Sequence, residues 1–195
     1  MMNVQHIELY TPAETAELTG IGVVLQRDHR RRFPEWMPPG AGHARFNLLQ
    51  CLQMSFVAEA AEFEIGPGKA YAAGEWVAHS ALQFALKEPG CIAGDLASDV
   101  TMPGASDDDI RDFTARRIFS EAFGRPNIVA PEFVFLWGDG TDWFGPSLEA
   151  CLGALPEGDP RRGKPFLSLH LPSFARRMVA KLPRPAVRIL QCEGA

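Results

Sequence analysis

The stretch YTPAETAELTGI, from Tyr10 to Ile21, decides how the first third of the chain folds. Thr11 can cap a helix, Pro12 suits the first helical position, and Glu14 completes a capping box with the cap residue. A helix should therefore begin here and end just before Thr19-Gly20, where the residues favour a turn.

A second helix, from about Gly22 to Arg32, carries most of the positive charge of this region. Its arginines fall within six residues and are opposed only by Asp28; they are Arg27, Arg30, Arg31 and Arg32. The whole chain is acidic, with 19 Lys+Arg against 24 Asp+Glu and a formal net charge of −5. A basic cluster in an acidic chain indicates one face that binds anions. The alternative is a solvated helix face whose arginines bind no ligand.

A loop and a third helix follow the basic helix. Residues 33–44 contain three prolines and two glycines, which forbid a helix. Arg45-Phe46 could close a short strand, and Asn47 then caps a helix that runs to about Glu62. Two helices, a turn, a loop that returns on Arg45-Phe46 and a capped third helix form the outline of a winged helix-turn-helix.

The stretch from Tyr10 to Ile21 resembles the opening of the MerR-like helix-turn-helix family. Arg27 falls where that family carries a DNA-contacting arginine on its recognition helix. The segment GHARFN, residues 42–47, looks like its wing and the start of the next helix. The resemblance covers roughly residues 8–62 and implies a module that binds double-stranded DNA.

The chain also departs from the family pattern. Gly22 stands where a small hydroxyl residue is usual, and Asp28 and His29 stand where aromatic residues are common. Gly66-Pro67-Gly68 interrupts the place of the family's long coiled-coil helix, and the cysteine pattern of its metal sensors is missing. The resemblance therefore implies neither metal sensing nor activation by promoter untwisting.

The resemblance places the second helix in the major groove of DNA. Arg27 and Arg31 are four residues apart and share a helix face, and an arginine fork can bond the edge of guanine. Gln26 could read adenine, whereas Arg32 and Arg45 would hold phosphates, as would the start of the first helix. The predicted DNA-binding residues are Thr11, Gln26, Arg27, Arg30, Arg31, Arg32 and Arg45.

A fourth helix should run from about Lys69 to Lys87. Its small residues recur at three- and four-residue steps and would let another helix approach, either within the chain or in a dimer; they are Gly74, Ala78, Ala81 and Ala85. Residues 89–105 contain prolines and glycines and predict a linker. We therefore divide the chain into residues 1–88, this linker and residues 106–195.

The second half mixes helices and strands, which makes the whole chain α+β. Ser106 and three aspartates start a helix that ends near Phe123. Beyond it we expect strands over 133–137, 142–144, 166–171 and 185–191, a hairpin turn at 138–140, and helices over 147–155 and 173–182. Large aromatic residues in this half predict a small α/β core, with a ligand pocket or a dimer patch as the alternative.

The sequence lacks the motifs that are typical of metal sites, of common enzyme and cofactor sites, and of membrane segments. The four cysteines form no C-x-x-C pair, and the five histidines show no H-E-x-x-H pattern, so we expect no metal. Walker A, G-x-S-x-G and dinucleotide fingerprints are absent, and we expect neither an enzyme nor a cofactor. No run approaches the ~18 apolar residues of a membrane span, and residues 1–10 show no secretory signal. We expect a cytoplasmic protein without a membrane partner.

Together these patterns predict a bacterial transcriptional regulator, acting as a repressor, that binds double-stranded DNA as a homodimer. The C-terminal region should dimerise or sense a small-molecule or protein effector. A phage-type accessory factor, such as an excisionase or a small terminase subunit, is one alternative, because such factors use similar winged modules. The other alternative is a protein-interaction or ligand-binding protein whose degenerate helix-turn-helix no longer binds DNA. The acidic net charge and the departures at Gly22, Asp28 and His29 are the features that point toward this alternative.

Overall fold

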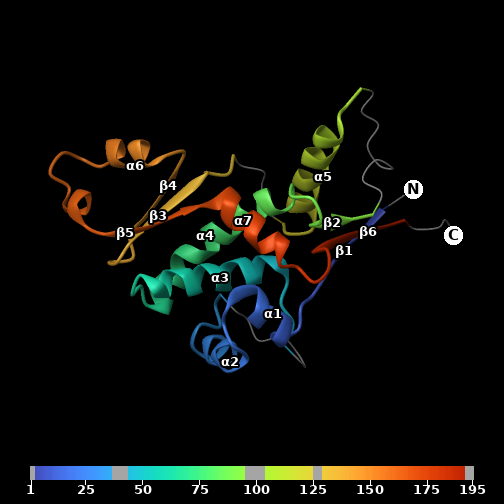
Figure 1. Cartoon of the computed structure of the whole chain (residues 1–195), viewed down its shortest axis with the longest axis horizontal. Coiled ribbons are helices and arrows are strands. Elements are labelled where there is room, and N and C mark those ends of the chain that lie inside the picture. The colour runs from blue at the N-terminus through green and yellow to red at the C-terminus, as the bar shows by residue number, and fades with distance from the viewer. Residues whose placement is uncertain (1–2, 37–43, 95–103, 125–128, 192–195) are drawn as a thin grey trace.

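The computed structural model describes residues 3–36, 44–94, 104–124 and 129–191. These residues form seven α-helices and six strands in two three-stranded sheets (Figure 1), which confirms the α+β class. The helices are α1 (Pro12–Thr19), α2 (Val23–Arg32), α3 (Leu48–Glu62), α4 (Pro67–Ala85), α5 (Asp107–Glu121), α6 (Leu148–Ala154) and α7 (Leu171–Ala180), with a 3-10 turn at Pro160–Gly163. The strands are β1 (Asn3–Ile7), β2 (Ile92–Ala93), β3 (Phe133–Trp137), β4 (Asp142–Gly145), β5 (Phe166–His170) and β6 (Val187–Gln191).

The helix pair α1–α2 forms where its local signals predict. The Thr11 hydroxyl accepts a hydrogen bond from the backbone N–H of Glu14, and the Glu14 carboxylate accepts one from the N–H of Thr11 at 2.7 Å. Gly20 ends α1 with φ = 75°, a left-handed conformation that glycine adopts without strain. A short turn then leads into α2.

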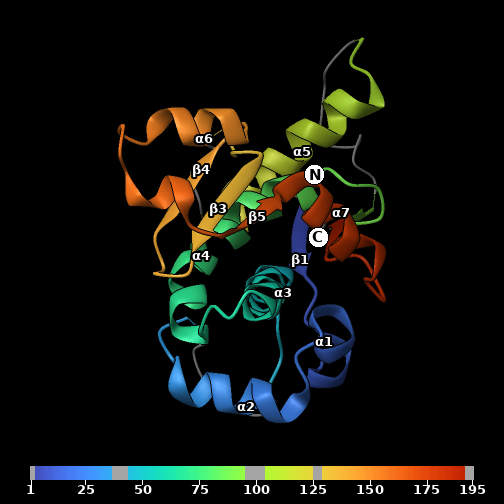
Figure 2. The same ribbon diagram turned by 60° about the vertical axis from the view of Figure 1, so that its left-hand side comes forward.

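Helix α3 lies at the centre of the molecule. Figure 2 shows it nearly end-on, with α1 and α2 on one side and the strands on the other. Gly74 of α4 lies against α3, because a Cβ at this position would come within 3.2 Å of the Gln53 side chain and 3.4 Å of Phe56. The small-residue stripe of α4 is therefore buried within the chain and does not form a dimer contact.

The two ends of the chain pair in one sheet. Strand β1 runs antiparallel to β6, with Ile7 opposite Val187, and β2 runs parallel to β6 on its other edge. The second sheet is antiparallel throughout, in the order β4-β3-β5. Strand β1, absent from the predicted elements, therefore joins the N-terminal helices to the C-terminal segment.

One hydrophobic core crosses the boundary predicted between residues 1–88 and 106–195. It contains Leu52 of α3, Ala78 of α4 and Phe174 of α7, because each half leaves an apolar face that the other half covers. Of the predicted linker, residues 95–103 lie outside the described residues, whereas Ile92–Ala93 form β2. A smaller aromatic cluster lies between the second sheet and α6.

Candidate nucleic-acid interface

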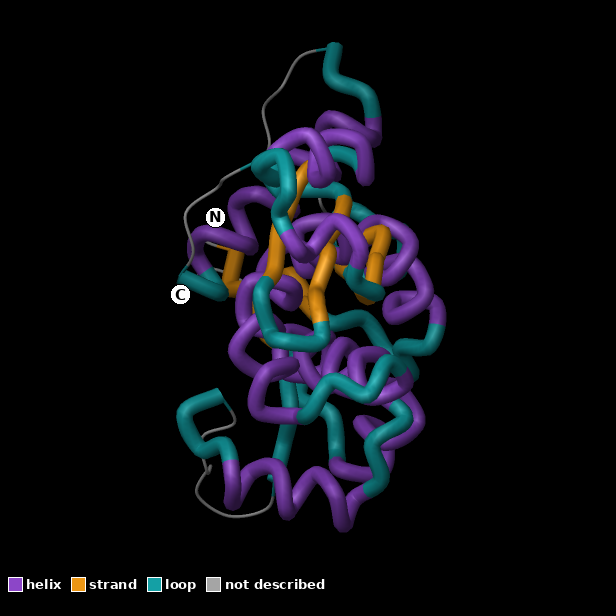
Figure 3. The backbone as a smooth tube through the Cα atoms, turned by 90° about the vertical axis from the view of Figure 1, so that its left-hand side faces the viewer, coloured by secondary structure: helices purple, strands orange, loops and turns teal. Residues whose placement is uncertain are grey.

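Helix α2 forms one end of the molecule, at the bottom of Figures 2 and 3. Its inner side holds it in place through Gln26, whose side-chain amide donates to the backbone oxygens of Pro12 at 2.9 Å and Ile21 at 2.8 Å. Only 1% of Gln26 is exposed. The prediction that Gln26 reads adenine is therefore corrected: its N–H groups tie α2 to the start of α1 and to the turn.

His29 is the second inner contact of α2. Its Nδ1 lies 2.9 Å from the hydroxyl of Tyr71 on α4, and the two rings meet edge to face. Burial lowers the pKa of His29, although the nearby Asp28 carboxylate acts in the opposite direction. The lowered pKa favours the neutral form of the His29 ring. His29, a departure from the family pattern in sequence, is thus the residue that attaches α2 to the core.

The outer side of α2 presents a short row of side chains to solvent. Val24 is 79% exposed, and Arg27 and Arg31 follow it at one and two helical turns. Val24 was not among the residues predicted from the sequence to bind DNA. Its spacing of three and seven residues from the two arginines is the signal that could have found it.

A cavity of about 430 Å³ opens beside this row, between the start of α1, α2 and the segment 44–46. We call it the arginine cavity; it is lined by Thr11, Pro12, Val23, Gln26, Arg27, Arg30, Ala44, Arg45 and Phe46. The structure thus brings together five of the seven residues predicted to bind DNA. The guanidinium groups of Arg27, Arg30 and Arg45 have no hydrogen-bond or ion-pair partner among the described residues.

A backbone bridge places Arg45 at this cavity. The N–H of Tyr10 donates to the oxygen of Phe46 at 2.8 Å, and the N–H of Phe46 donates back to Tyr10 at 3.0 Å. This bridge fixes the predicted wing to Tyr10, two residues before α1 begins. Of that wing, residues 42 and 43 lie outside the described residues.

The other two predicted arginines lie apart from the cavity. Arg31 and Arg32 both pair with Asp28, at 2.8 Å and 2.9 Å. Ion pairs between exposed side chains contribute little, roughly 0–1 kcal/mol, so a phosphate could replace Asp28 at small cost. The exposed surface of α2 is positive even with Asp28 included.

The C-terminal half supports this surface through Arg184, which sequence reasoning did not single out. Its guanidinium carbon lies 5.0 Å from the ring centre of Tyr10, a residue with no exposed area. Its Nε also pairs with Glu8 at 3.2 Å. Arg184 therefore holds the chain segment that leads into α1, and no local pattern could have predicted it.

Metal sites and membrane-spanning helices are not found in the part of the chain that the structure describes. Its three cysteines are buried free thiols, and no group of three His, Cys, Asp or Glu side chains could hold a metal ion. Nor does any helix there have the length and apolar character needed to cross a membrane.

Comparisons with known proteins do not indicate a function for this chain. No protein-family model, no curated protein and no solved structure matches the chain.

Proposed function

We propose that this chain is a sequence-specific DNA-binding protein that represses transcription, with α1 and α2 acting as a winged helix-turn-helix. The observation that carries the proposal is the convergence of Arg27, Arg30 and Arg45 on one cavity without an acidic partner among the described residues. Unneutralised arginines on one face of an acidic protein support binding to a polyanion.

Helix α2 is the part that would read bases. An α-helix fits the major groove, where Arg27 can donate two hydrogen bonds to one guanine. The exposed methyl groups of Val24 suit contact with the methyl group of thymine. A row of one apolar and two cationic side chains therefore favours a specific sequence over an arbitrary one.

The arginine cavity is the part that would hold the DNA backbone. Arg30 and Arg45 flank it, and the positive end of α1 points toward its Thr11 edge. Phosphate contacts set the register of a protein on DNA and make its affinity depend on salt. We assign Arg30 and Arg45 to this role and Arg27 to base reading.

A homodimer is part of the proposal. Helix α2 reads only a few base pairs, and two copies about one helical turn of DNA apart would multiply the affinity for a palindromic site. The small-residue stripe of α4 is buried within the chain, so the dimer has to use another surface.

The test starts from a randomised duplex library, from which the purified full chain selects its preferred sequence. Anisotropy then compares the selected duplex with a scrambled one at several salt concentrations. We expect preferred binding that weakens steeply with salt and a footprint with twofold symmetry. Equal binding to both duplexes would contradict sequence reading and favour an accessory, architectural role. Absence of binding at low salt would contradict the whole proposal.

A further inference from the structure

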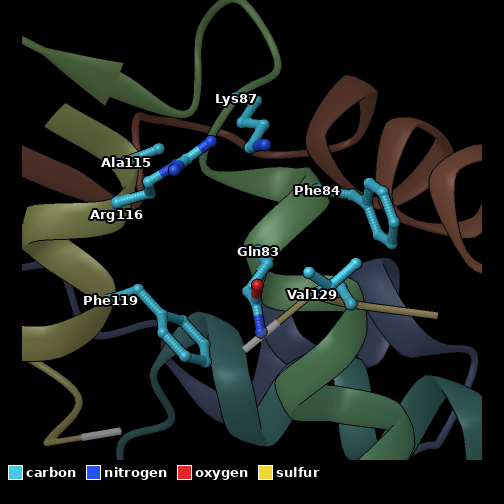
Figure 4. Close-up of a pocket in the computed structure, with 8 residues that line it drawn as sticks. Gln83, Phe84, Lys87, Ala115, Arg116, Phe119 and Val129 are labelled. Atoms are coloured by element: carbon cyan, nitrogen blue, oxygen red, sulfur yellow. The ribbon is translucent and has the colours of Figure 1, made fainter. Parts of the chain in front are cut away.

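A second cavity lies where the C-terminal end of α4 meets α5 (Figure 4). These two helix segments lie away from α2 in Figure 1. Its volume is about 290 Å³, near the lower end of the ~300–1,000 Å³ typical of small-molecule pockets. We call it the α4–α5 cavity; it is lined by Gln83, Phe84, Lys87, Ala115, Arg116, Phe119, Val129 and Ala130.

The floor of this cavity is formed by buried apolar residues. Ala115 and Phe119 are each 2% exposed and belong to the hydrophobic core. Phe84 is half-buried against the same core, and Val129 lies at the mouth, where it is 97% exposed. An apolar group placed here would lose contact with water without displacing any charged side chain.

One side of the cavity is cationic. Figure 4 shows the ends of Lys87 and Arg116 turned toward each other, with Phe119 across from them. Both pair with Asp112, at 2.5 Å from Lys87 and 2.6 Å from Arg116. The Lys87 ammonium has three donors, and Asp112 is its one partner among the described residues. It can therefore donate to a further acceptor from the cavity.

We propose that the α4–α5 cavity binds a small carboxylate with an aromatic or branched aliphatic body. The carboxylate would accept hydrogen bonds from Lys87 and Arg116, and its apolar body would lie on Ala115 and Phe119. The cavity volume of about 290 Å³ suits a molecule of this size. This site is separate from the arginine cavity, and it stands whether or not the chain binds DNA.

Calorimetric titration of the full chain tests the site. The panel is benzoate, phenylacetate, 3-phenylpropionate and 4-methylpentanoate, each beside its neutral amide. We expect at least one acid to bind with Kd below about 1 mM and its amide to bind at least about tenfold more weakly. Binding of no acid, or equal binding of acid and amide, overturns the proposal.

Variants locate the site. Lys87→Gln and Arg116→Gln should each weaken binding of the acid by about tenfold. Gln83→Trp should abolish binding by filling the cavity while the circular dichroism spectrum stays unchanged. Arg111→Gln is the matched control, because it removes the same charge from α5 outside the cavity lining and should leave the affinity unchanged. Equal effects of the α5 variants Arg111→Gln and Arg116→Gln would show general charge attraction and overturn the site.

Discussion

The guanidinium of Arg184 donates hydrogen bonds to both carboxylate oxygens of Glu14, although 170 residues separate the two in the chain. Glu14 is the residue that closes the capping box at the start of α1. The last part of the chain thus fixes the first turn of the helix pair that we propose to bind DNA. This contact makes the helix pair part of the whole fold rather than an independent arm.

Replacing Arg184 with methionine should lower the free energy of unfolding by about 1–3 kcal/mol, because it removes charge-assisted hydrogen bonds to Glu8 and Glu14. Urea unfolding of the full chain measures this. Arg176→Met is the control, since Arg176 is 71% exposed in its pair with Glu88 and should cost less than about 1 kcal/mol. If both variants lose the same free energy of unfolding, the contacts of Arg184 stabilise the fold no more than an exposed ion pair does.

Acid should weaken this contact in a defined pH window. The hydrogen bonds from Arg184 and from the backbone of Thr11 lower the pKa of Glu14 from 4.5 to about 2. A lowered pKa in the folded state adds stability above pH 4.5, which is lost as the pH falls from 4.5 toward 2. The stability difference between the natural chain and Arg184→Met should shrink across this window. A difference that stays constant down to pH 2 would contradict the assignment.

Gln26→Ala should destabilise the fold without changing the DNA sequence that the protein selects. The substitution leaves the Pro12 and Ile21 oxygens without these hydrogen bonds and opens a small cavity, at a cost of about 1–3 kcal/mol. Thermal unfolding and library selection measure the two effects separately. Unchanged stability together with lost preference at one base pair would restore the adenine-reading role.

His29 should make the fold sensitive to mild acid. Burial lowers the pKa of His29 below its ordinary 6.5, so the unfolded chain takes up a proton more readily than the folded one. Stability is therefore greatest above pH 6.5 and falls as the pH drops through that value. Urea unfolding at a series of pH values measures how the free energy of unfolding depends on pH. His29→Phe should make this dependence less steep. If the pH dependence of the free energy of unfolding is unchanged in this variant, His29 is not its cause.

Local signals in the sequence predicted three helix starts, whereas α4 and α7 begin at Pro67 and Leu171, two residues before the predicted positions 69 and 173. The capping residues Thr11, Asn47 and Ser106 all begin helices as expected, each through a side chain that accepts the N–H three residues on. Such signals lie within one helical turn, so a single sequence displays them completely. The hairpin between β3 and β4 was predicted for the same reason.

Contacts between distant residues could not be predicted in this way. Strand β1 pairs with β6 at the other end of the chain, and Arg184 reaches Glu14 across the fold. Gln26 is polar and lies within the basic helix, yet it faces inward because two backbone oxygens need its amide. Five predicted site residues still converged, because the Tyr10–Phe46 bridge brings Arg45 back to the α1–α2 pair.

The most direct test of the proposed function is the affinity of three single variants for the selected duplex and for a scrambled one. Arg27→Ala should weaken specific binding by about 1–3 kcal/mol, which is more than it weakens non-specific binding. Arg45→Ala should weaken both about equally and reduce the slope of log affinity against log salt by about one. Arg176→Ala, which removes the same charge far from α2, should change neither. If Arg27→Ala and Arg45→Ala bind both duplexes as the natural chain does, the proposed DNA-binding surface is wrong.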